Sequence, residues 1–105
     1  PVELLEGYTR FCGKMRALPA WVHEGAIVGM QGGTAKVRKV LEQLDQAGAA
    51  VSAFWLQDWV GKRKTAAGSQ LWWSWELDRN HYPGWDELVG DLKSRSMRVL
   101  TYVNP

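Results

Sequence analysis

The clearest periodic segment of the chain is predicted to be an amphipathic helix over about residues 35–47. Thr34 precedes it and is expected to cap it, because its hydroxyl can accept a hydrogen bond from a free N–H of the first turn. Gly48 follows and is expected to end the helix in the left-handed conformation. The apolar face consists of Val37, Val40, Leu41, Leu44 and Ala47, and the opposite face of Arg38, Lys39, Glu42, Gln43, Asp45 and Gln46.

Three short apolar segments are predicted to be strands, over about residues 25–31, 50–58 and 98–103. The second lacks a regular alternation of apolar and polar residues, which is typical of a strand covered on both faces. A second amphipathic helix is expected over about residues 85–95. Ser96 follows that helix at a position where glycine would be less strained.

Two segments carry no strong pattern. Residues 1–20 are expected to form a lead-in with a short helical or irregular part around 3–15. Residues 60–84 are expected to be a long connection, and connections of this length inside a compact domain are usually functional. The residues that interrupt these two segments are Gly7, Gly13, Pro19, Gly61, Gly68, Pro83 and Gly84.

The predicted order is strand, helix, strand, long connection, helix, strand. Such connections give right-handed crossovers and parallel strands, so the fold class is α/β. Three parallel strands cannot close a sheet. A (β/α)₈ TIM barrel has about 250 residues, so three of its eight units take on the order of 95. We therefore expect residues 21–105 to be a fragment of a TIM barrel, about its first three βα units.

Composition excludes several classes of protein. The chain has 105 residues, 46% hydrophobic and 23% charged, with a net charge of +2, which is typical of one small globular domain. The charge is too small and its one basic run, Lys62 to Lys64, too short to favour a nucleic-acid partner. No segment has the roughly 18 apolar residues of a membrane helix, so we expect no membrane partner. Cys12 is the only cysteine, which favours a reducing compartment and a cytoplasmic location.

The sequence predicts no metal or cofactor. His23 and His81 are isolated and match no ligand spacing. The Gln31–Thr34 turn is glycine-rich, as anion-binding turns before helices are, but it lacks the Gly-Lys-Ser/Thr ending of a phosphate loop.

Each predicted strand ends in a polar side chain, at the place where (β/α)₈ barrels carry their active sites. These residues are Gln31, then Gln57 with Asp58, and Asn104. Period-two counting places Gln57 in the barrel mouth with Trp55 beneath it. Asp58 lies on the other strand face, where it either pairs with a loop residue such as Arg63 or contacts a ligand.

Amides and tryptophans together favour a carbohydrate ligand. An amide supplies both a donor and an acceptor for hydroxyl groups, and indole rings offer flat apolar surface. Four of the seven tryptophans lie between Trp59 and Trp75. Both residue types also have purely structural uses, the amides as strand caps and the tryptophans in the core.

The order and spacing of several motifs closely resemble glycoside hydrolase family 31, in particular its sulfoquinovosidase-like α-glycosidase branch. The resemblance covers about residues 17–105. It is carried by Gly29–Thr34, Trp55–Trp59 with Gly61 and Arg63, Trp72–Trp75 with Tyr82-Pro83, and Leu100–Pro105. It implies a retaining α-glycosidase whose TIM barrel begins with this chain.

The resemblance also implies site residues. Gln31, Gln57 and Trp73 match residues that surround the sulfonate of the substrate in the sulfonate-recognising branch. Asp58, Trp59 and Asn104 are candidates for a supporting role at the same site. Gln70 stands where that branch has an arginine. A neutral amide cannot make the charge-assisted bonds that an anion favours, so a sulfoquinovoside and a neutral α-glucoside both stay open as substrates.

No catalytic residue is predicted in this chain. The nucleophile and the acid/base of the family follow the fourth and sixth strands, which we expect beyond Pro105, and Asp58, Glu76 and Asp78 are not assigned to these roles. The alternative function is a non-catalytic carbohydrate-binding module that stacks sugars on tryptophan. The sequence leaves the oligomeric state open.

Overall fold

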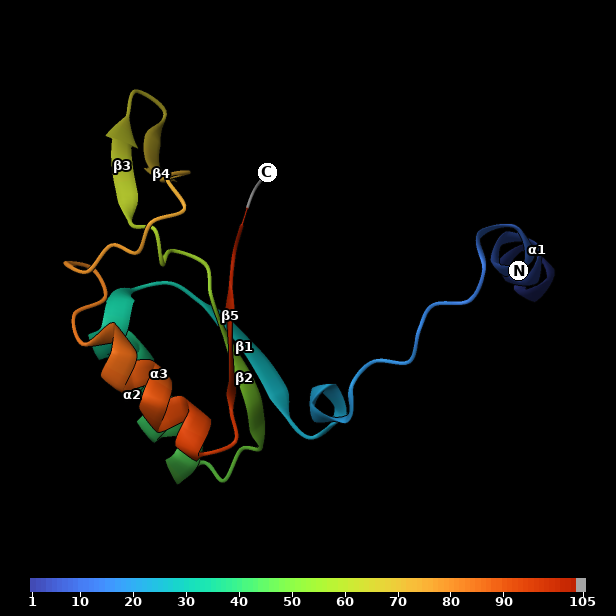
Figure 1. The fold of residues 1–105 in the computed structure, drawn as a ribbon, viewed down its shortest axis with the longest axis horizontal. Coiled ribbons are helices and arrows are strands. Elements are labelled where there is room, and N and C mark those ends of the chain that lie inside the picture. Colours follow the sequence, from blue (N-terminus) through green and yellow to red (C-terminus); the bar gives the residue numbers. More distant parts are fainter. Residues whose placement is uncertain (104–105) are drawn as a thin grey trace.

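A computed structural model describes residues 1–103, and its centre is a three-stranded parallel sheet with two helices on one face (Figure 1). The strand order is β1-β2-β5 and both pairings are parallel. This confirms the predicted mixed α/β class and parallel strands. The elements are α1 (Val2–Cys12), a 3₁₀ helix (Ala20–His23), β1 (Ala26–Met30), α2 (Gly33–Gln46), β2 (Val51–Leu56), β3 (Lys62–Thr65), β4 (Gly68–Leu71), α3 (Trp85–Ser94) and β5 (Arg98–Thr101).

The register of the sheet brings its strand ends level with one another. Leu56, the last residue of β2, pairs with Met30 of β1 and with Thr101 of β5. The residues that follow these positions therefore emerge at one edge. The second strand is shorter than predicted, so Gln57 and Asp58 lie in the turn after β2. Asn104, the predicted polar residue after the third strand, lies outside the described residues.

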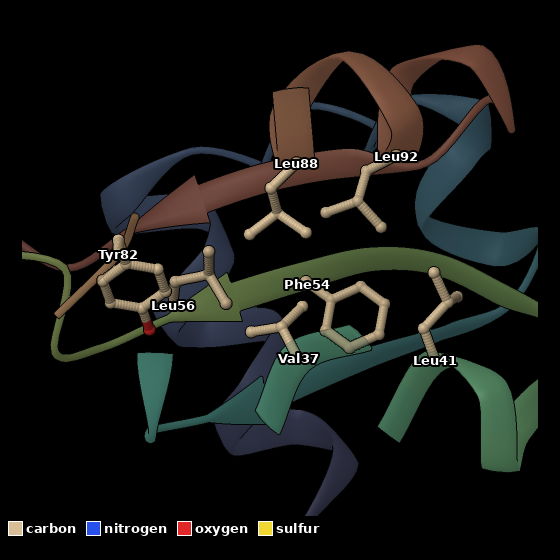
Figure 2. Close-up of a cluster of buried hydrophobic side chains, with 7 residues drawn as sticks. All are labelled: Val37, Leu41, Phe54, Leu56, Tyr82, Leu88 and Leu92. Carbon is tan, nitrogen blue, oxygen red and sulfur yellow. The ribbon is translucent and has the colours of Figure 1, made fainter. Parts of the chain in front are cut away.

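The hydrophobic core lies between the sheet and the two helices (Figure 2). Each buried aliphatic or aromatic side chain of this kind stabilises a fold by about 1.5–3 kcal/mol. The cluster confirms the predicted apolar face of the first helix, which packs with Phe54 and Leu56 of β2 and with Leu88 and Leu92 of α3. It consists of Val37, Leu41, Phe54, Leu56, Tyr82, Leu88 and Leu92.

Both helices end in the same C-terminal motif. After α2, the N–H groups of Gly48 and Ala49 donate to the carbonyls of Asp45 and Leu44, and Gly48 has φ +65°. After α3, Ser96 takes the equivalent position with φ +62°. This is the Schellman arrangement, and it confirms the predicted left-handed position of Gly48 and the strained one of Ser96.

The predicted N-cap of α2 is wrong. The helix already includes Gly33, its N-cap is Gly32, and Thr34 lies in the first turn. The Thr34 hydroxyl donates to the carbonyl of Pro83 at 2.7 Å. A tertiary contact therefore uses the hydroxyl that the local pattern assigned to capping.

The predicted long connection over residues 60–84 contains a regular element that the sequence did not indicate. It contains an antiparallel hairpin in which Lys62 pairs with Leu71 and Thr65 with Gly68. The hairpin extends beyond the end of the sheet from which Gln57 emerges (Figure 1). Its strands are largely exposed and polar, so they lack the apolar alternation that marks a strand in a sequence.

The lead-in does contain a helix, as expected. No residue of α1 is buried, and an extended segment separates it from the sheet (Figure 1). Within residues 1–103, no helix is both long and apolar enough to cross a membrane.

Candidate functional site

The side chains of Gln31 and Gln57 meet at the carboxyl ends of β1 and β2. The Gln31 amide Nε2 donates to Gln57 Oε1 at 3.0 Å, and the backbone N–H of Gln57 donates to the carbonyl of Met30 at 3.1 Å. Both side chains are half-buried. An amide has two N–H donors and two lone pairs, so after this shared bond the pair still offers donors and acceptors to a ligand.

Gln57 lines a pocket of about 220 Å³ together with Trp55, Leu71 and Tyr102. Trp55 lies on the same sheet face as Gln57, as the period-two pattern predicts. Its ring centroid lies 6.5 Å from that of Tyr102. Trp55 is 38% exposed, so it offers aromatic surface next to the amide pair.

Trp59 connects the turn after β2 to the end of β5. Its indole Nε1 donates to the carbonyl of Tyr102 at 2.6 Å. The bond joins Trp59 to Tyr102, which lines the pocket, and the supporting role of Trp59 stays a prediction.

Gln70 lies on β4 of the hairpin, and Trp73 lies two residues after the end of that strand. Both side chains are exposed. Gln70 pairs with Arg63 across the hairpin, and the Arg63 guanidinium lies 5.1 Å from the centroid of the Trp72 ring. Leu71 lines the pocket of Gln57. Because side chains alternate along a strand, Gln70 lies on the opposite face of the hairpin from Leu71. The substrate roles of Gln70 and Trp73 stay predictions.

Asp58 is fully buried, and three donors surround its carboxylate. Oδ1 accepts a hydrogen bond from the Tyr82 hydroxyl at 2.6 Å, and Oδ2 accepts one from the Gly32 N–H at 2.8 Å. His81 Nε2 lies 2.6 Å from Oδ2. An ionised carboxylate only accepts, so this nitrogen carries the proton. Asp58 does not pair with Arg63, the partner suggested from the sequence. Its side-chain partners His81 and Tyr82 were not predicted.

These contacts shift the pKa values of the buried pair in opposite directions. Burial raises the pKa of Asp58, but the hydrogen bonds from Tyr82, His81 and Gly32 together outweigh burial, so the pKa lies below its usual value. Burial, followed by the bond to the Asp58 carboxylate, raises the pKa of Tyr82 well above its usual value. Asp58 is therefore ionised and Tyr82 neutral across the ordinary pH range.

Two glycines allow the segment around His81 to pack against the start of α2. Gly33 has φ +76°, and a Cβ atom there would lie 2.3 Å from the carbonyl oxygen of His81. Gly32 has φ +131°. Both backbone conformations favour glycine, so the Gly-Gly pair after Gln31 sets the shape of this turn.

The carboxylates near the strand ends have structural partners. Both oxygens of Asp58 accept hydrogen bonds, and Asp78 Oδ1 accepts from the backbone N–H groups of Asn80 and His81 at 3.0 Å each. In the described part of the chain, no three His, Cys, Asp or Glu side chains gather where they could hold a metal ion. The arrangement at the strand ends is suited to binding a polar ligand.

Comparisons with known proteins identify close relatives. No protein-family model matches the chain. A sulfoquinovosidase of Escherichia coli (strain K12) is 35% identical over 104 residues, which is 99% of this chain. A sulfoquinovosidase of Agrobacterium fabrum (strain C58) is 39% identical over 103 residues, or 98% of this chain.

The fold agrees with a solved structure of the same kind. A GH31 family sulfoquinovosidase from E. rectale, in complex with the aza-sugar inhibitor IFGSQ, matches 97% of this chain with a TM-score of 0.82 and 35% identity. The chain spans 15% of the length of each of these three relatives. Sequence and fold together show that the chain corresponds to a short segment of glycoside hydrolase family 31 sulfoquinovosidases.

Proposed function

We propose that the chain forms part of the sugar-binding subsite of a retaining α-glycosidase and contributes none of the catalytic carboxylates. The observation that carries this proposal is the hydrogen-bonded pair of Gln31 and Gln57 at two adjacent parallel strand ends, beside a pocket lined by Trp55 and Tyr102. Amides next to aromatic surface suit the hydroxyl groups and the apolar face of a sugar ring.

The sheet fits the beginning of a (β/α)₈ barrel, over residues 21–105. Its helices cover one face only, and the other face leaves Ile27 and Trp55 40% and 38% exposed. In a TIM barrel the helices lie outside, the opposite sheet face lies inside, and the site forms at the carboxyl ends of the strands. The two edge strands β1 and β5 would pair with further strands of the same barrel.

The names of the relatives support a proposed substrate class. Both curated relatives are sulfoquinovosidases, so we propose an α-linked sulfoquinovoside or α-glucoside as substrate. Gln70 bears on the choice, because an amide in place of the arginine of the family weakens the recognition of an anionic sulfonate.

The catalytic pair is assigned to segments outside this chain. Retaining hydrolysis needs two carboxyl groups about 5–5.5 Å apart, one to attack and one to donate a proton. The buried carboxylate of Asp58, with hydrogen bonds to both oxygens, is unsuited to either role.

A second candidate function rests on the tryptophans after β4. Trp72, Trp73 and Trp75 are 45%, 65% and 54% exposed, which favours sugar stacking of the kind used by carbohydrate-binding modules. Such a module would bind saccharides without any catalytic segment.

Hydrolysis of 4-nitrophenyl α-glucoside and 4-nitrophenyl α-sulfoquinovoside tests the proposal. The complete protein that carries this chain is expected to release nitrophenol from at least one of them, and the isolated chain from neither. Turnover by a rigorously purified isolated chain would overturn the placement of the catalytic pair. A complete protein that binds saccharides and hydrolyses neither substrate would favour the binding module.

A further inference from the structure

The carboxylate of Asp58 joins the two strand ends that carry the proposed sugar-binding amides. Asp58 follows Gln57 directly, and Gly32 follows Gln31 directly. The hydrogen bond from the Gly32 N–H to Asp58 Oδ2, 2.8 Å long, therefore connects the backbone just after one glutamine to the side chain just after the other.

The bond to Asp58 holds the first glycine of this turn, Gly32, whereas the second, Gly33, is already part of α2. Gly32 and Gly33 both have positive φ values, and glycine has more accessible backbone conformations than any other residue. Gln31 lies beyond the last residue of β1. The direction of its side chain therefore depends on how the following peptide group is held.

The carboxylate is itself held in one orientation. Tyr82 binds Oδ1, and His81 binds the same oxygen as Gly32, so both oxygens have donors from a segment far along the chain. The side chain is fully buried, which strengthens hydrogen bonds to a charged group. Asp58 thus presents a rigid acceptor to the Gly32 N–H.

We propose that Asp58 is a positioning residue of the sugar subsite, whose hydrogen bond to the Gly32 N–H orients the Gln31 amide toward Gln57 and the substrate. The positioning role rests on the proposed function, because the bond from Gly32 to Asp58 affects catalysis only where the glutamine pair contacts the sugar. Asp58 acts through Gln31 and does not touch the substrate.

Two consequences distinguish positioning from general support of the fold. Loss of Asp58 raises KM and leaves kcat nearly unchanged, because the affected group binds substrate and takes no part in bond cleavage. The effect also disappears when Gln31 is already truncated, since no amide is left to orient.

The conservative variant Asp58→Asn retains most of the function. Its amide oxygen can accept from the Gly32 N–H, and its NH₂ group can donate to the oxygen of the Tyr82 hydroxyl. Thr34→Val is the matched control, because it removes the hydrogen bond to the Pro83 carbonyl beside the same turn and leaves the bond between Asp58 and Gly32 in place.

The test measures kcat and KM of the complete protein with 4-nitrophenyl α-glucoside and 4-nitrophenyl α-sulfoquinovoside, using whichever substrate it cleaves faster. We expect Asp58→Ala to raise KM about tenfold, the effect of one misplaced hydrogen bond to substrate, with kcat within about twofold. Asp58→Asn and Thr34→Val should stay within about threefold of the wild-type KM, although both lower Tm. Asp58→Ser replaces Asp58→Ala where the alanine variant does not fold.

The double variant Gln31→Ala with Asp58→Ala completes a cycle and separates the two proposals. We expect its KM to equal that of Gln31→Ala alone. Independent, multiplying effects of the two substitutions, or a KM for Thr34→Val as high as for Asp58→Ala, would overturn the positioning role while leaving the sugar subsite intact. A Gln31→Ala variant with wild-type KM would overturn the subsite itself.

Discussion

The Tyr82 hydroxyl lies 2.6 Å from Oδ1 of Asp58, and both side chains are fully buried. The two residues come from separate segments, the turn after β2 and the turn before α3. Their bond helps to hold the long connection over residues 60–84 against the sheet. It also makes the stability of this region depend on the ionisation of one carboxylate.

We predict that Asp58 contributes to stability in a pH-dependent way. Its pKa in the folded protein lies below the ordinary value of 3.8, so its contribution is fully present above that pH and is lost as pH falls through the folded pKa. The Tm difference between wild type and Asp58→Asn should therefore be largest near neutral pH and shrink below pH 3.8. Thermal unfolding of the complete protein at several pH values measures it.

The matched control is Asp91→Asn. Asp91 forms an exposed ion pair with Arg38 at 2.7 Å, and such pairs contribute about 0–1 kcal/mol. Its Tm difference should be small at every pH. An Asp58→Asn difference that stays constant, or grows, on acidification would contradict the assigned direction of the pKa shift.

The Schellman motifs after α2 and α3 predict opposite effects of two substitutions. Ser96→Gly should stabilise the protein by up to about 1 kcal/mol, because glycine adopts the left-handed conformation without strain. Gly48→Ala should destabilise it by about the same amount, since no atom lies within 4 Å of the added Cβ and only the backbone strain remains. Chemical unfolding of the two variants measures both changes. Equal signs would show that backbone conformation does not govern these positions.

Gln70→Arg should favour a sulfonated substrate. In the complete protein, the added guanidinium is expected to raise kcat/KM for the sulfoquinovoside relative to the glucoside by about tenfold, as for a charge-assisted hydrogen bond. Gln43→Arg, on the exposed face of α2, adds the same charge away from the strand ends and should leave the ratio unchanged. No change in the ratio for Gln70→Arg would remove Gln70 from the anion subsite.

The isolated chain should associate or unfold readily. Both β1 and β5 are edges of the sheet, and unpaired parallel edges are sites for pairing with other chains. Sedimentation at increasing concentration should detect association, and thermal unfolding should be broad. A concentration-independent monomer with a sharp two-state transition would contradict this expectation.

Much of the fold could be predicted because the local patterns agree with the tertiary structure. The apolar positions of α2 and α3 do face the core, and the three predicted strands do pair in parallel. The hairpin could not be predicted in the same way. Its residues Lys62, Arg63 and Lys64 are exposed, so they carry no signal of burial. The two central positions of its turn are Ala66 and Ala67, where two-residue hairpin turns favour glycine or asparagine.

The candidate site was predictable only in part, for a similar reason. Gln31 and Gln57 follow adjacent parallel strands, and the rule that such ends meet at one edge brings them together. The partners of Asp58 do not follow from any local pattern. His81 and Tyr82 lie 23 and 24 residues further along the chain, and they reach the carboxylate because the segment before α3 packs against the start of α2.

The most direct measurement is the kcat/KM of Gln57→Ala in the complete protein, beside Gln43→Ala as the matched control. Gln57 lines the pocket and bonds to Gln31, whereas Gln43 is an exposed residue of α2. If the pair belongs to the sugar subsite, Gln57→Ala lowers kcat/KM for the better nitrophenyl glycoside about tenfold, mainly through KM, with Gln43→Ala unchanged. Equal, wild-type values for both variants would contradict the account.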